Sequence, residues 1–357
     1  MHIVVVGLNH RSAPIELREQ LAVQSEQLPD VLTRLRSDAG LQEVAVLSTC
    51  NRVEIYGRVS ELDGAVARLH QFLSRHGGIE EAQLSTRLYS CIEPQSIRHL
   101  FSVTSGLDSM VLGEGEILRQ VKLAYERAKA CGATGKVFNV LFQRALNAAK
   151  AVRTQTGIGR GATSIGAVAV ELAGKIFDPL SHAVVVLVGA GKIGELTLKR
   201  LTDRGVRDLR VVNRSPERAV DLAATYAARP VSYGELGAQL VEADIVITST
   251  SAGSYLLSRA AVEEAMRVRR HRPLCVVDLG VPRNVDPAIG QVENVYRFDI
   301  DDLQGVVAHA HHSRQQAVTQ SRRIIDEKVE RFLSWWREEA GACVPDDVSS
   351  SELAAVR

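Results

Sequence analysis

The sequence predicts an α/β protein with two unlike domains and a long C-terminal helix. Three observations lead to this prediction. The 357 residues exceed the roughly 150 residues of a typical domain, which favours two or three domains. Strand-like and helix-like patterns alternate through the middle of the chain, as in α/β folds. After residue 300 the pattern changes to one long helical repeat.

Composition and charge exclude several classes of protein. Hydrophobic residues form 45% of the chain and charged residues 24%, as in a soluble globular protein. A net charge of +1 leaves only local patches to attract nucleic acid or membranes. No apolar run approaches the roughly 18 residues of a membrane span, and the N-terminus does not resemble a signal peptide. The 5 cysteines form no Cys-x-x-Cys pair, so a reduced, cytoplasmic compartment is expected.

The first domain is expected over residues 1–155 and is an α/β unit. Apolar runs predict strands at His2–Val6, Val44–Leu47 and Val53–Val59. Leucines at helical spacing predict one helix over Ala13–Arg36. From Ser96 to Ala151 the pattern is mainly helical, with an interruption at glycines 113 and 115.

The second domain is expected over residues 156–300 as a Rossmann-type, doubly wound sheet. An unbroken β-branched run at Ala183–Val188 is typical of a buried parallel strand. Further strands are predicted at Leu209–Asn213, Asp244–Thr248 and Leu274–Val277, and helices at Ser164–Phe177, after Gly194 and at Pro216–Ala228. Such alternation indicates a doubly wound parallel sheet. The glycine-rich segment Gly157–Gly161 is a candidate hinge between the domains.

Residues 301–340 are predicted to form a long helix, followed by a flexible tail over 341–357. Apolar residues recur every three, four or seven positions at Val318, Ile325, Val329, Phe332 and Trp336. This spacing gives a seam for packing against another helix.

A dinucleotide site is predicted in the second domain. Gly189-Ala190-Gly191-Lys192-Ile193-Gly194 directly follows a buried strand and opens a helix, which is the context that makes this motif informative. Gly189 permits the tight turn, Gly191 the approach of a pyrophosphate, and Gly194 close packing of helix and strand. The alternative is a tight turn without a ligand.

The second strand of this domain indicates which dinucleotide binds. It ends in Asn213-Arg214-Ser215, where an NAD site usually carries a carboxylate for the ribose hydroxyl. Arg214 and Ser215 can instead donate to a 2′-phosphate, so NADPH is the predicted cofactor. The alternative is a surface arginine on a loop.

Cys50 is the candidate nucleophile. It follows a predicted strand within Ser48-Thr49-Cys50-Asn51-Arg52, and the neighbouring arginine is expected to lower the thiol pKa. A thiolate beside a nicotinamide site can take an acyl group from an ester as a thioester, which hydride then reduces to an aldehyde. The alternative is a small residue buried at the end of a strand.

Two further features have competing interpretations. The segment Arg127–Val170 contains seven basic residues and no acidic one, so it is either a surface for phosphates or a solvated helix face. The cluster His309-Ala310-His311-His312 is a conceivable metal site, but adjacent histidines on a polar helix favour a solvated cluster, and no metal is expected.

Several motifs together resemble those of the glutamyl-tRNA reductase family. They are Gly7–Pro14, Ser48–Tyr56, His99–Gln120, Thr163–Leu172, Gly189–Gly194 and Val277–Asn284, within a resemblance that runs from residue 2 to about residue 336. The resemblance implies NADPH-dependent reduction of glutamyl-tRNA to glutamate-1-semialdehyde with release of the tRNA. This reaction is the first step of tetrapyrrole (5-aminolevulinate, porphyrin) biosynthesis from glutamate.

The resemblance also implies roles for individual residues. Cys50 corresponds to the family's nucleophile, and His99 to a histidine needed for activity. The glutamyl group is expected to be held by Thr49, Asn51, Arg52, Ser109, Glu114, Gly115, Glu116 and Gln120. Arg52 can pair with the substrate's γ-carboxylate through two parallel hydrogen bonds. The cofactor is expected to contact Gly189, Ala190, Gly191, Lys192, Ile193, Gly194, Asn213, Arg214 and Ser215.

The chain departs from the family pattern in three places. Glu116 stands where an amide is common, and Arg119 replaces a small residue. A carboxylate facing the substrate's γ-carboxylate would weaken binding, and Arg119 would compensate for it. The family usually continues well beyond the long helix, so residues 301–340 are interpreted as a shortened dimerisation domain.

The resemblance implies partners as well as chemistry. A homodimer through the C-terminal helix and an aminomutase that captures the aldehyde are expected, and the basic stretch acquires a candidate partner in the tRNA backbone. Two alternatives stay open. One is a non-catalytic or regulatory paralogue that binds tRNA or NADPH. The other is a shikimate-dehydrogenase-like reductase of a small ketone.

Overall fold

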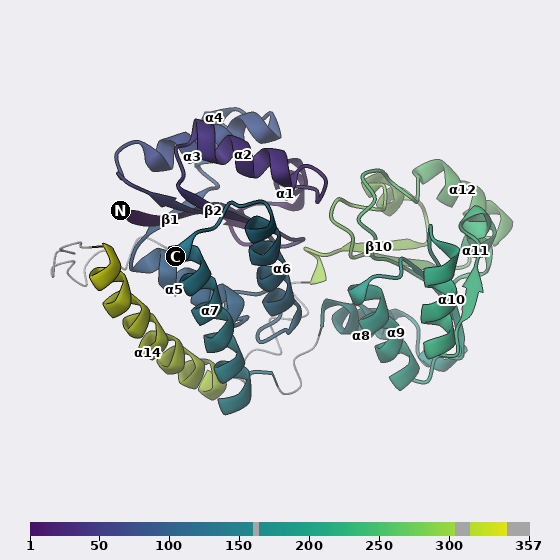
Figure 1. Ribbon diagram of the computed structural model, residues 1–357. Helices are drawn as coiled ribbons and strands as arrows, with labels where there is room; N and C mark the ends of the chain where they lie inside the picture. Colours follow the sequence, from purple (N-terminus) through teal and green to yellow (C-terminus); the bar gives the residue numbers. More distant parts are fainter. Residues whose placement is uncertain (160–163, 304–314, 341–357) are drawn as a thin grey trace.

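The computed structural model describes residues 1–159, 164–303 and 315–340 (Figure 1). It has two α/β lobes and a long C-terminal helix that lies against the first lobe, which confirms the predicted fold class. Among the described residues, no helix is both long enough and apolar enough to span a bilayer.

The first lobe is built on an antiparallel sheet in the order β2-β3-β1-β4. Its strands are β1 (His2–Asn9), β2 (Glu43–Ser48), β3 (Arg52–Val59) and β4 (Tyr89–Ile92). Its helices are α1 (Ile15–Leu21), α2 (Leu28–Asp38), α3 (Ala65–Gly77), α4 (Glu81–Ser85), α5 (Gln95–Thr104), α6 (Glu116–Ala130) and α7 (Lys136–Gln155). The helices α2 and α3 cover one face of the sheet and α5, α6 and α7 the other, so the sheet is buried on both sides (Figure 1).

The prediction of one helix over Ala13–Arg36 was wrong, because α1 ends at Leu21 and α2 begins at Leu28. Pro29 lies in the first turn of α2. Proline has no N–H to donate and clashes with the preceding turn, so it is tolerated only where a helix begins. The prediction also had no counterpart for α3, α4 and β4, the last of which is short and only half-buried.

The second lobe contains a parallel sheet in the order β10-β9-β8-β5-β6-β7. Its strands are β5 (Val184–Val188), β6 (Asp208–Val212), β7 (Arg229–Val231), β8 (Ile245–Thr248), β9 (Leu274–Asp278) and β10 (Val295–Asp299). Its helices are α8 (Ile165–Ile176), α9 (Lys192–Asp203), α10 (Pro216–Thr225), α11 (Leu236–Glu242) and α12 (Arg259–Val268). The chain winds outward in one direction from β5 to β7 and in the other from β8 to β10. The order therefore reverses between β5 and β8, where ligands of such sheets bind.

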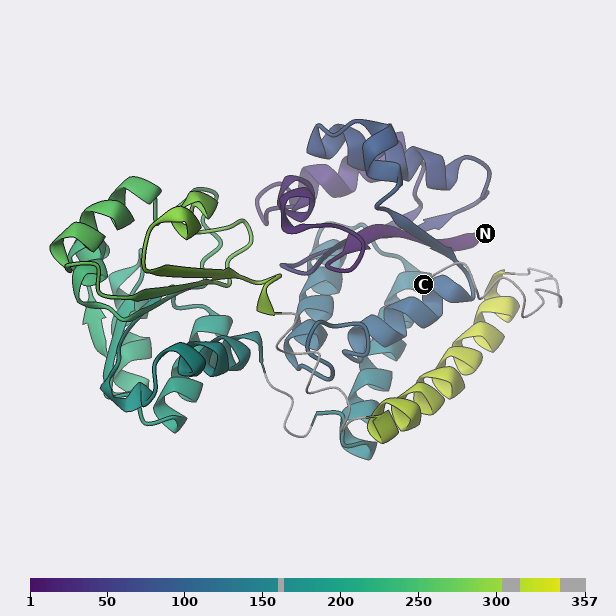
Figure 2. The same ribbon diagram turned by 180° about the vertical axis from the view of Figure 1, so that it is seen from behind.

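The C-terminal helix α14 (Gln315–Ala340) packs back onto the first lobe, along α5 and α7 (Figure 2). Its predicted seam is fully buried at Val329, Phe332 and Trp336 and joins the core of that lobe. The Arg144 guanidinium of α7 lies 5.8 Å from the ring centre of Phe332 and 5.2 Å from that of Trp335. The seam therefore serves packing within the chain.

Three predicted features lie partly or wholly outside the described residues. The histidine cluster at 309–312 and the tail at 341–357 are outside them altogether. Of the glycine-rich joint, Gly157, Ile158 and Gly159 are described, and Ile158 is fully buried in the core of the first lobe. A hinge in this segment would therefore have to lie after Ile158.

Replacing Trp336 by alanine is expected to destabilise the first lobe by about 3–5 kcal/mol, because a large buried ring leaves a cavity that the surroundings fill only partly. Chemical denaturation followed by circular dichroism measures the effect. Glu338→Ala, on the exposed side of the same helix, is the control and is expected to change stability by less than about 0.5 kcal/mol. Equal stability of the two variants would contradict the packing role of the seam.

Candidate active site between the two domains

Cys50 lies at the tip of the hairpin that joins β2 to β3. The Thr49 N–H donates to the Arg52 carbonyl at 2.8 Å. The Thr49 hydroxyl accepts from the N–H groups of Asn51 (3.2 Å) and Arg52 (3.1 Å). A threonine hydroxyl that caps its own turn in this way holds the tip in one conformation. Because the hairpin ends at the boundary of the lobes, Cys50 packs against the apolar cluster of the second lobe.

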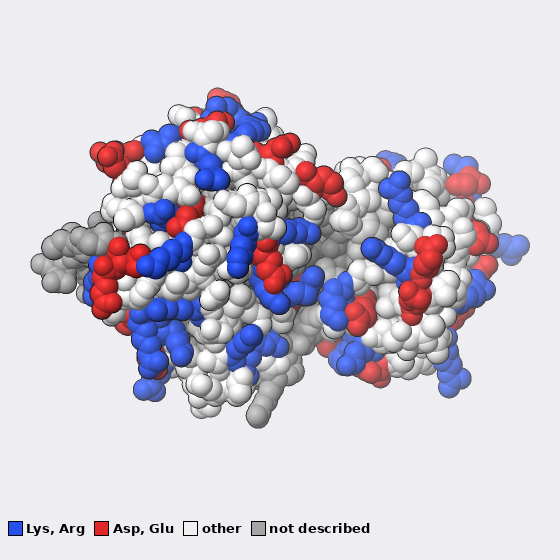
Figure 3. Space-filling view, viewed as in Figure 1, with Lys and Arg blue, Asp and Glu red and all other residues white. Residues whose placement is uncertain are grey.

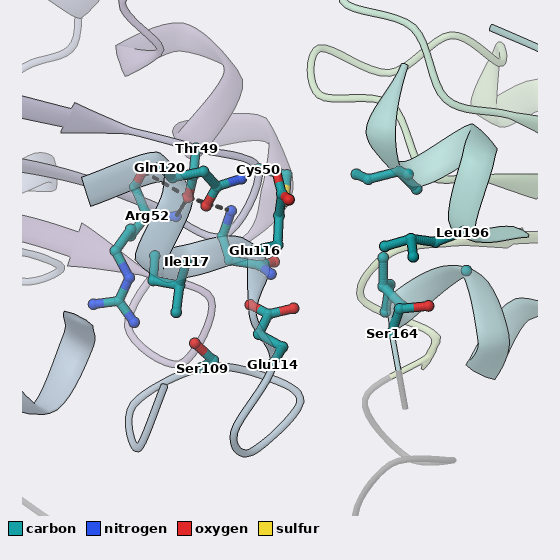
Figure 4. Close-up of a pocket in the computed structure, with 14 residues that line it drawn as sticks. Thr49, Cys50, Arg52, Ser109, Glu114, Glu116, Ile117, Gln120, Ser164 and Leu196 are labelled. Carbon is teal, nitrogen blue, oxygen red and sulfur yellow. Dashed lines mark hydrogen bonds between the residues drawn. The ribbon is translucent and has the colours of Figure 1, made fainter. Parts of the chain in front are cut away.

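Side chains from both lobes line one cavity around Cys50 (Figure 4). The first lobe contributes Thr49, Cys50, Asn51, Arg52, Ser109, Glu114, Glu116, Ile117 and Gln120, and the second Ser164, Ile165, Gly166, Ile193 and Leu196. The structure thus brings together every residue predicted to hold the substrate except Gly115, which is exposed and does not line the cavity. The cavity is polar toward the first lobe and apolar toward the second.

The prediction that a neighbouring arginine lowers the pKa of the Cys50 thiol was wrong. Burial, with the Glu114 charge acting in the same direction, raises the pKa of Cys50 to about 12. The cation that opposes this rise most is Arg18 of α1, which donates to the Cys50 carbonyl. The thiol is therefore protonated at neutral pH, and its attack on an ester needs a proton acceptor.

Arg52 points away from Cys50 and into a buried ionic network. Its guanidinium donates to Glu54 at 2.6 Å and to the Asp108 carboxylate at 2.9 Å. The Glu54 carboxylate is completely buried and also accepts from Tyr89 at 2.5 Å and from Tyr56. Burial alone would raise the pKa of Glu54, but the Arg52 charge outweighs it and holds this pKa well below its usual range.

His99 belongs to this network and not to the lining of the Cys50 cavity. Its Nε2 lies 2.8 Å from a Glu54 carboxylate oxygen, and its ring centre is 5.4 Å from that of Tyr89. Through the described contacts, His99 is linked to the Cys50 cavity by way of Glu54 and Arg52. Any influence of His99 on the reaction is expected to pass through the placement of Arg52.

Glu114 is the group near Cys50 whose charge is most easily changed. Burial raises the pKa of Glu114 to about 7, and the Glu116 charge acts in the same direction, whereas the Ser109 hydroxyl and Arg52 oppose it. A carboxyl with this pKa exchanges a proton readily at neutral pH, as a general acid or base must.

Glu116 and Arg119 form an ion pair at the start of α6. The Arg119 Nε donates to both carboxylate oxygens of Glu116, at 3.1 and 3.2 Å. Most of the Glu116 side chain is buried, whereas that of Arg119 is 55% exposed. The pairing places a cation beside the unusual carboxylate, and whether Arg119 compensates for it in substrate binding stays a prediction.

The glycine motif forms the turn from β5 to α9 at the point where the sheet order reverses. Gly189 has a φ of +115°, and a Cβ there would lie 2.7 Å from the Ser249 carbonyl oxygen. A Cβ on Gly194 would lie 2.6 Å from the Gly189 carbonyl oxygen, so the helix fits closely only without it. No described atom lies within 4 Å of a Cβ built on Gly191, which leaves its backbone open to a ligand.

The cleft beside this turn is shared with the first lobe. Cys50, Glu116, Arg119 and Gln120 line it opposite Gly189, Ala190, Gly191, Lys192 and Ile193. Lys192 pairs with Glu195 at 2.9 Å, and the Asn213 side-chain oxygen accepts from the Ala190 N–H at 3.3 Å. A nicotinamide dinucleotide bound to the glycine turn would thus enter a cleft that already contains Cys50, the predicted nucleophile.

A second pocket adjoins the glycine turn and suits a 2′-phosphate. Arg214, Ser215 and Arg218 line it, together with Tyr233, Thr250 and Ser251. Among its described lining residues there is no Asp or Glu to repel a phosphate. The residues present therefore fit NADPH.

Three residues of this region were not predicted from the sequence. Arg218 could have been predicted from the sequence, because it lies four residues after Arg214, in the first turn of α10. Asp108 directly precedes the predicted Ser109, but nothing in the sequence indicates its pairing with Arg52. Arg18 is fully buried although it lies in a charged helix, and only tertiary structure shows its contacts.

Comparisons with known proteins agree with this geometry. A family model described as "Glutamyl-tRNAGlu reductase, N-terminal domain" matches residues 6–156, and one described as "Shikimate / quinate 5-dehydrogenase" matches residues 171–306. The chain is 43% identical to the glutamyl-tRNA reductase of Syntrophotalea carbinolica over 94% of this chain and 76% of the relative. It is 42% identical to that of Halorhodospira halophila over 99% of this chain and 79% of the relative.

A solved structure gives the same assignment. The glutamyl-tRNA reductase from Methanopyrus kandleri is 33% identical, with a TM-score of 0.51 over 94% of this chain and 81% of the other. The similarity therefore spans both lobes and the C-terminal helix, and the chain belongs to the glutamyl-tRNA reductase family.

Proposed function

We propose that Cys50 carries the glutamyl group as a thioester in the reaction of this enzyme. The chain is an NADPH-dependent oxidoreductase that reduces glutamyl-tRNA to glutamate-1-semialdehyde, the first step of tetrapyrrole synthesis from glutamate. The observation that carries the proposal is the position of Cys50, which lines both the polar cavity of the first lobe and the dinucleotide cleft of the second. A group held there is accessible from both sides.

In the first half of the reaction, the Cys50 sulfur attacks the ester carbonyl carbon of the glutamyl-tRNA. Glu114, as a carboxylate, takes the thiol proton, because the thiol is protonated at neutral pH. The carbon–oxygen bond to the tRNA breaks, and the terminal ribose hydroxyl leaves with the proton that Glu114 returns. The product is a glutamyl thioester on Cys50 and free tRNA.

The second half of the reaction needs a hydride at the same carbon. Bound NADPH supplies this hydride, and we propose that the glycine turn and the pocket of Arg214, Ser215 and Arg218 hold it. The carbon–sulfur bond then breaks to give the aldehyde and the Cys50 thiolate, which takes up a proton. The apolar wall formed by Ile165, Ile193 and Leu196 excludes water, which would otherwise hydrolyse the thioester.

The glutamyl group itself is proposed to bind among Thr49, Asn51, Ser109 and Gln120. Arg52 is the candidate partner of the γ-carboxylate, although in this structure its guanidinium is engaged by Glu54 and Asp108. When the substrate carboxylate binds, Arg52 therefore either gives up its ion pair with Asp108 or binds both carboxylates. The bond to Glu54 is retained in this scheme and fixes the direction of the guanidinium.

We propose that the tRNA contacts the basic residues of α6 and α7 that have no structural task. Lys136 pairs with Glu339, Arg144 packs on α14, and Arg153 donates to the Gly113 carbonyl, so these three stabilise the fold. Arg127, Lys129 and Lys150 are exposed. Figure 3 shows Lys and Arg side chains scattered over this face rather than gathered in one patch. What supports the proposal is the exposure of these three side chains, whose cationic groups can pair with phosphate oxygens.

We also propose that the two domain limits lie slightly after the predicted residues 155 and 300, because Ile158 is buried in the core of the first lobe and Leu303 in that of the second. The helix that returns to the first domain is α14, Gln315–Ala340. A homodimer through the C-terminal helix would use its polar side, since the apolar seam is buried within the chain. A cytoplasmic location and an aminomutase partner remain proposals. The four described cysteines are unpaired.

Replacement of Cys50 by serine is expected to abolish NADPH oxidation with purified glutamyl-tRNA, because a serine hydroxyl is a far weaker nucleophile. The measurement is the absorbance of NADPH over time, with circular dichroism to establish that the variant is folded. Cys131→Ser, an exposed cysteine of the same lobe, is the control and is expected to keep full activity. Normal turnover of the Cys50 variant would disprove the thioester.

Replacing Glu114 by glutamine is expected to slow transfer of the glutamyl group to Cys50 by about 100-fold at pH 7.5 or above. Since the pKa of Glu114 is raised to about 7, the carboxylate and hence the wild-type rate increase as the pH rises through about 7. In the variant the increase in rate near pH 7 disappears, and the rate rises only at higher pH, where the thiol itself ionises. Single-turnover acylation without NADPH, measured across pH, tests this, with exposed Glu126→Gln as control.

Replacing Arg218 by alanine is expected to raise the Kd for NADPH about tenfold or more and to leave the Kd for NADH unchanged. The loss corresponds to one charge-assisted hydrogen bond to a phosphate. Fluorescence titration of both nucleotides gives the ratio. Arg207→Ala, an exposed arginine of the same lobe, should bind both as the wild type does. Equal weakening of both nucleotides would place Arg218 away from the 2′-phosphate.

A further inference from the structure

Arg18 is a fully buried arginine that the scheme above does not use. It lies on α1 in the first lobe, and its side-chain exposure is 0%. One Nη donates to the Cys50 carbonyl, the other donates to the Asp301 carboxylate, and Nε donates to the Ala13 carbonyl at 3.3 Å. A single guanidinium thus joins the nucleophile's loop to a carboxylate that is 283 residues away in the sequence.

Asp301 belongs structurally to the second lobe. It follows β10, and the neighbouring residues Ile300 and Leu303 are fully buried in the apolar cluster of that lobe. Its N–H donates to the Asp299 carboxylate at 3.0 Å, which fixes the turn after the strand. The Asp301 carboxylate is therefore carried by the second lobe and moves with it.

The helix α1 is a point at which the lobes touch. Ile15 is buried in the apolar cluster of the second lobe. Arg283, in the loop after β9, pairs with Glu16 at 2.8 Å and with Glu19 at 3.0 Å. Arg18 and Arg283 thus both cross the boundary at α1, but of the two only Arg18 also contacts the Cys50 loop. This difference provides a matched pair for experiments.

We propose that Arg18 is a positioning residue that couples the placement of the second lobe to the reactivity of Cys50, with Asp301 as the coupling partner. The proposal rests on the role of Cys50 as the nucleophile. With the lobes as described here, the Asp301 charge offsets that of Arg18. A movement that withdraws Asp301 leaves the full guanidinium charge beside the Cys50 loop, where it favours the thiolate.

The charges around Cys50 make this coupling effective. Glu114 and Glu116 disfavour the thiolate from the loop before α6 and from its first turn, and Arg18 is the largest charge in its favour. Because Cys50 is partly buried at the boundary of the lobes, water screens these charges less than it would at the open surface. Acylation is then fastest with the second lobe withdrawn, and its return brings the cofactor cleft to the finished thioester. The position of one carboxylate would thus match the reactivity of Cys50 to the half-reaction in progress.

The test compares the alkylation rate of Cys50 by iodoacetamide at pH 8 in the wild type, Asp301→Asn and Arg18→Met, with peptide mass spectrometry as the readout. Alkylation follows the thiolate fraction, which changes tenfold for each pKa unit, so a shift of about half a unit changes the rate about threefold. We expect Asp301→Asn to react about threefold faster and Arg18→Met about threefold slower. Cys131, which is exposed, serves as an internal standard for reagent and exposure time.

Arg283→Met is the control, because it removes two ion pairs of the lobe boundary, those with Glu16 and Glu19, without touching the Cys50 loop. Its Cys50 is expected to react within about twofold of the wild type. A change in the same direction in Asp301→Asn and Arg18→Met, or an acceleration in Arg283→Met equal to that in Asp301→Asn, would overturn the proposal. If Arg18→Met does not fold, the Cys50 alkylation rate of Asp301→Asn is sufficient as a test. An unchanged rate in Asp301→Asn refutes the coupling.

Alkylation needs neither tRNA nor NADPH, so its outcome is independent of the proposed reaction. Loss of turnover in Cys50→Ser together with an unchanged Asp301→Asn would leave the thioester intact and remove the coupling. A second readout is the amount of NADPH oxidised per glutamyl group transferred to Cys50 in one turnover. We expect this ratio to fall at least twofold in Asp301→Asn, because acylation is faster while the second lobe is less well placed.

Discussion

The buried carboxylate of Glu54 is the interaction around which the first lobe is organised. A carboxylate without contact to water is stable only when its charge and oxygens are matched, and here Arg52, Tyr56, Tyr89 and His99 all surround it. These partners come from β3, β4 and α5, so a single charge fixes the relative positions of three elements. Arg52 in turn fixes Asp108, which directly precedes Ser109 in the loop that leads to Glu114.

This network explains why the cavity at Cys50 is polar on one side and rigid. Ser109 and Glu114 line the substrate cavity, whereas Arg52, Glu54 and Tyr56 behind them are buried. The buried charges of Arg52 and Glu54 hold the loops in place. Ser109 and Glu114 remain available to bind the substrate and to exchange protons. The cavity depends on the network more than the network depends on the cavity, since loss of a buried partner such as Arg52 would displace several cavity-lining residues at once.

Much of the fold and part of the site could be predicted from the sequence, for identifiable reasons. The β-branched run before Gly189 and the glycines after it indicate a strand and a tight turn from neighbouring residues alone. In the structure, Gly189 and Gly194 have no room for a Cβ, and Gly191 leaves its backbone open. The strands on either side of Cys50 could also be predicted from the residues next to it. The break between α1 and α2 depended on Pro29, whose effect the leucine spacing masked. The short strands β4, β7 and β10 carry little pattern of their own and are held by their neighbours.

The electrostatics of the site could not be predicted, because they depend on residues distant in sequence. Arg52 is adjacent to Asn51 and close to Cys50 along the chain, yet β3 directs its side chain inward to Glu54. The cation that acts on the thiol is Arg18, which is 32 residues away. Sequence adjacency is a poor guide at a hairpin, since side chains alternate between the faces of a strand. The family motifs named residues that the structure places around one cavity, but not the direction in which each side chain points.

The return of α14 to the first lobe has a mechanical consequence. The chain leaves the first lobe after Gly159, forms the second lobe, and comes back to contribute Val329, Phe332 and Trp336 to the core it left. The cofactor-binding lobe is therefore an insertion, attached by two covalent strands of chain rather than suspended from one. Two covalent attachments limit the displacements and rotations of a lobe more than a single attachment does, because each one sets how far its end of the lobe can move from the first lobe. Such a restriction favours one repeatable path between Cys50 and the hydride donor over a random search.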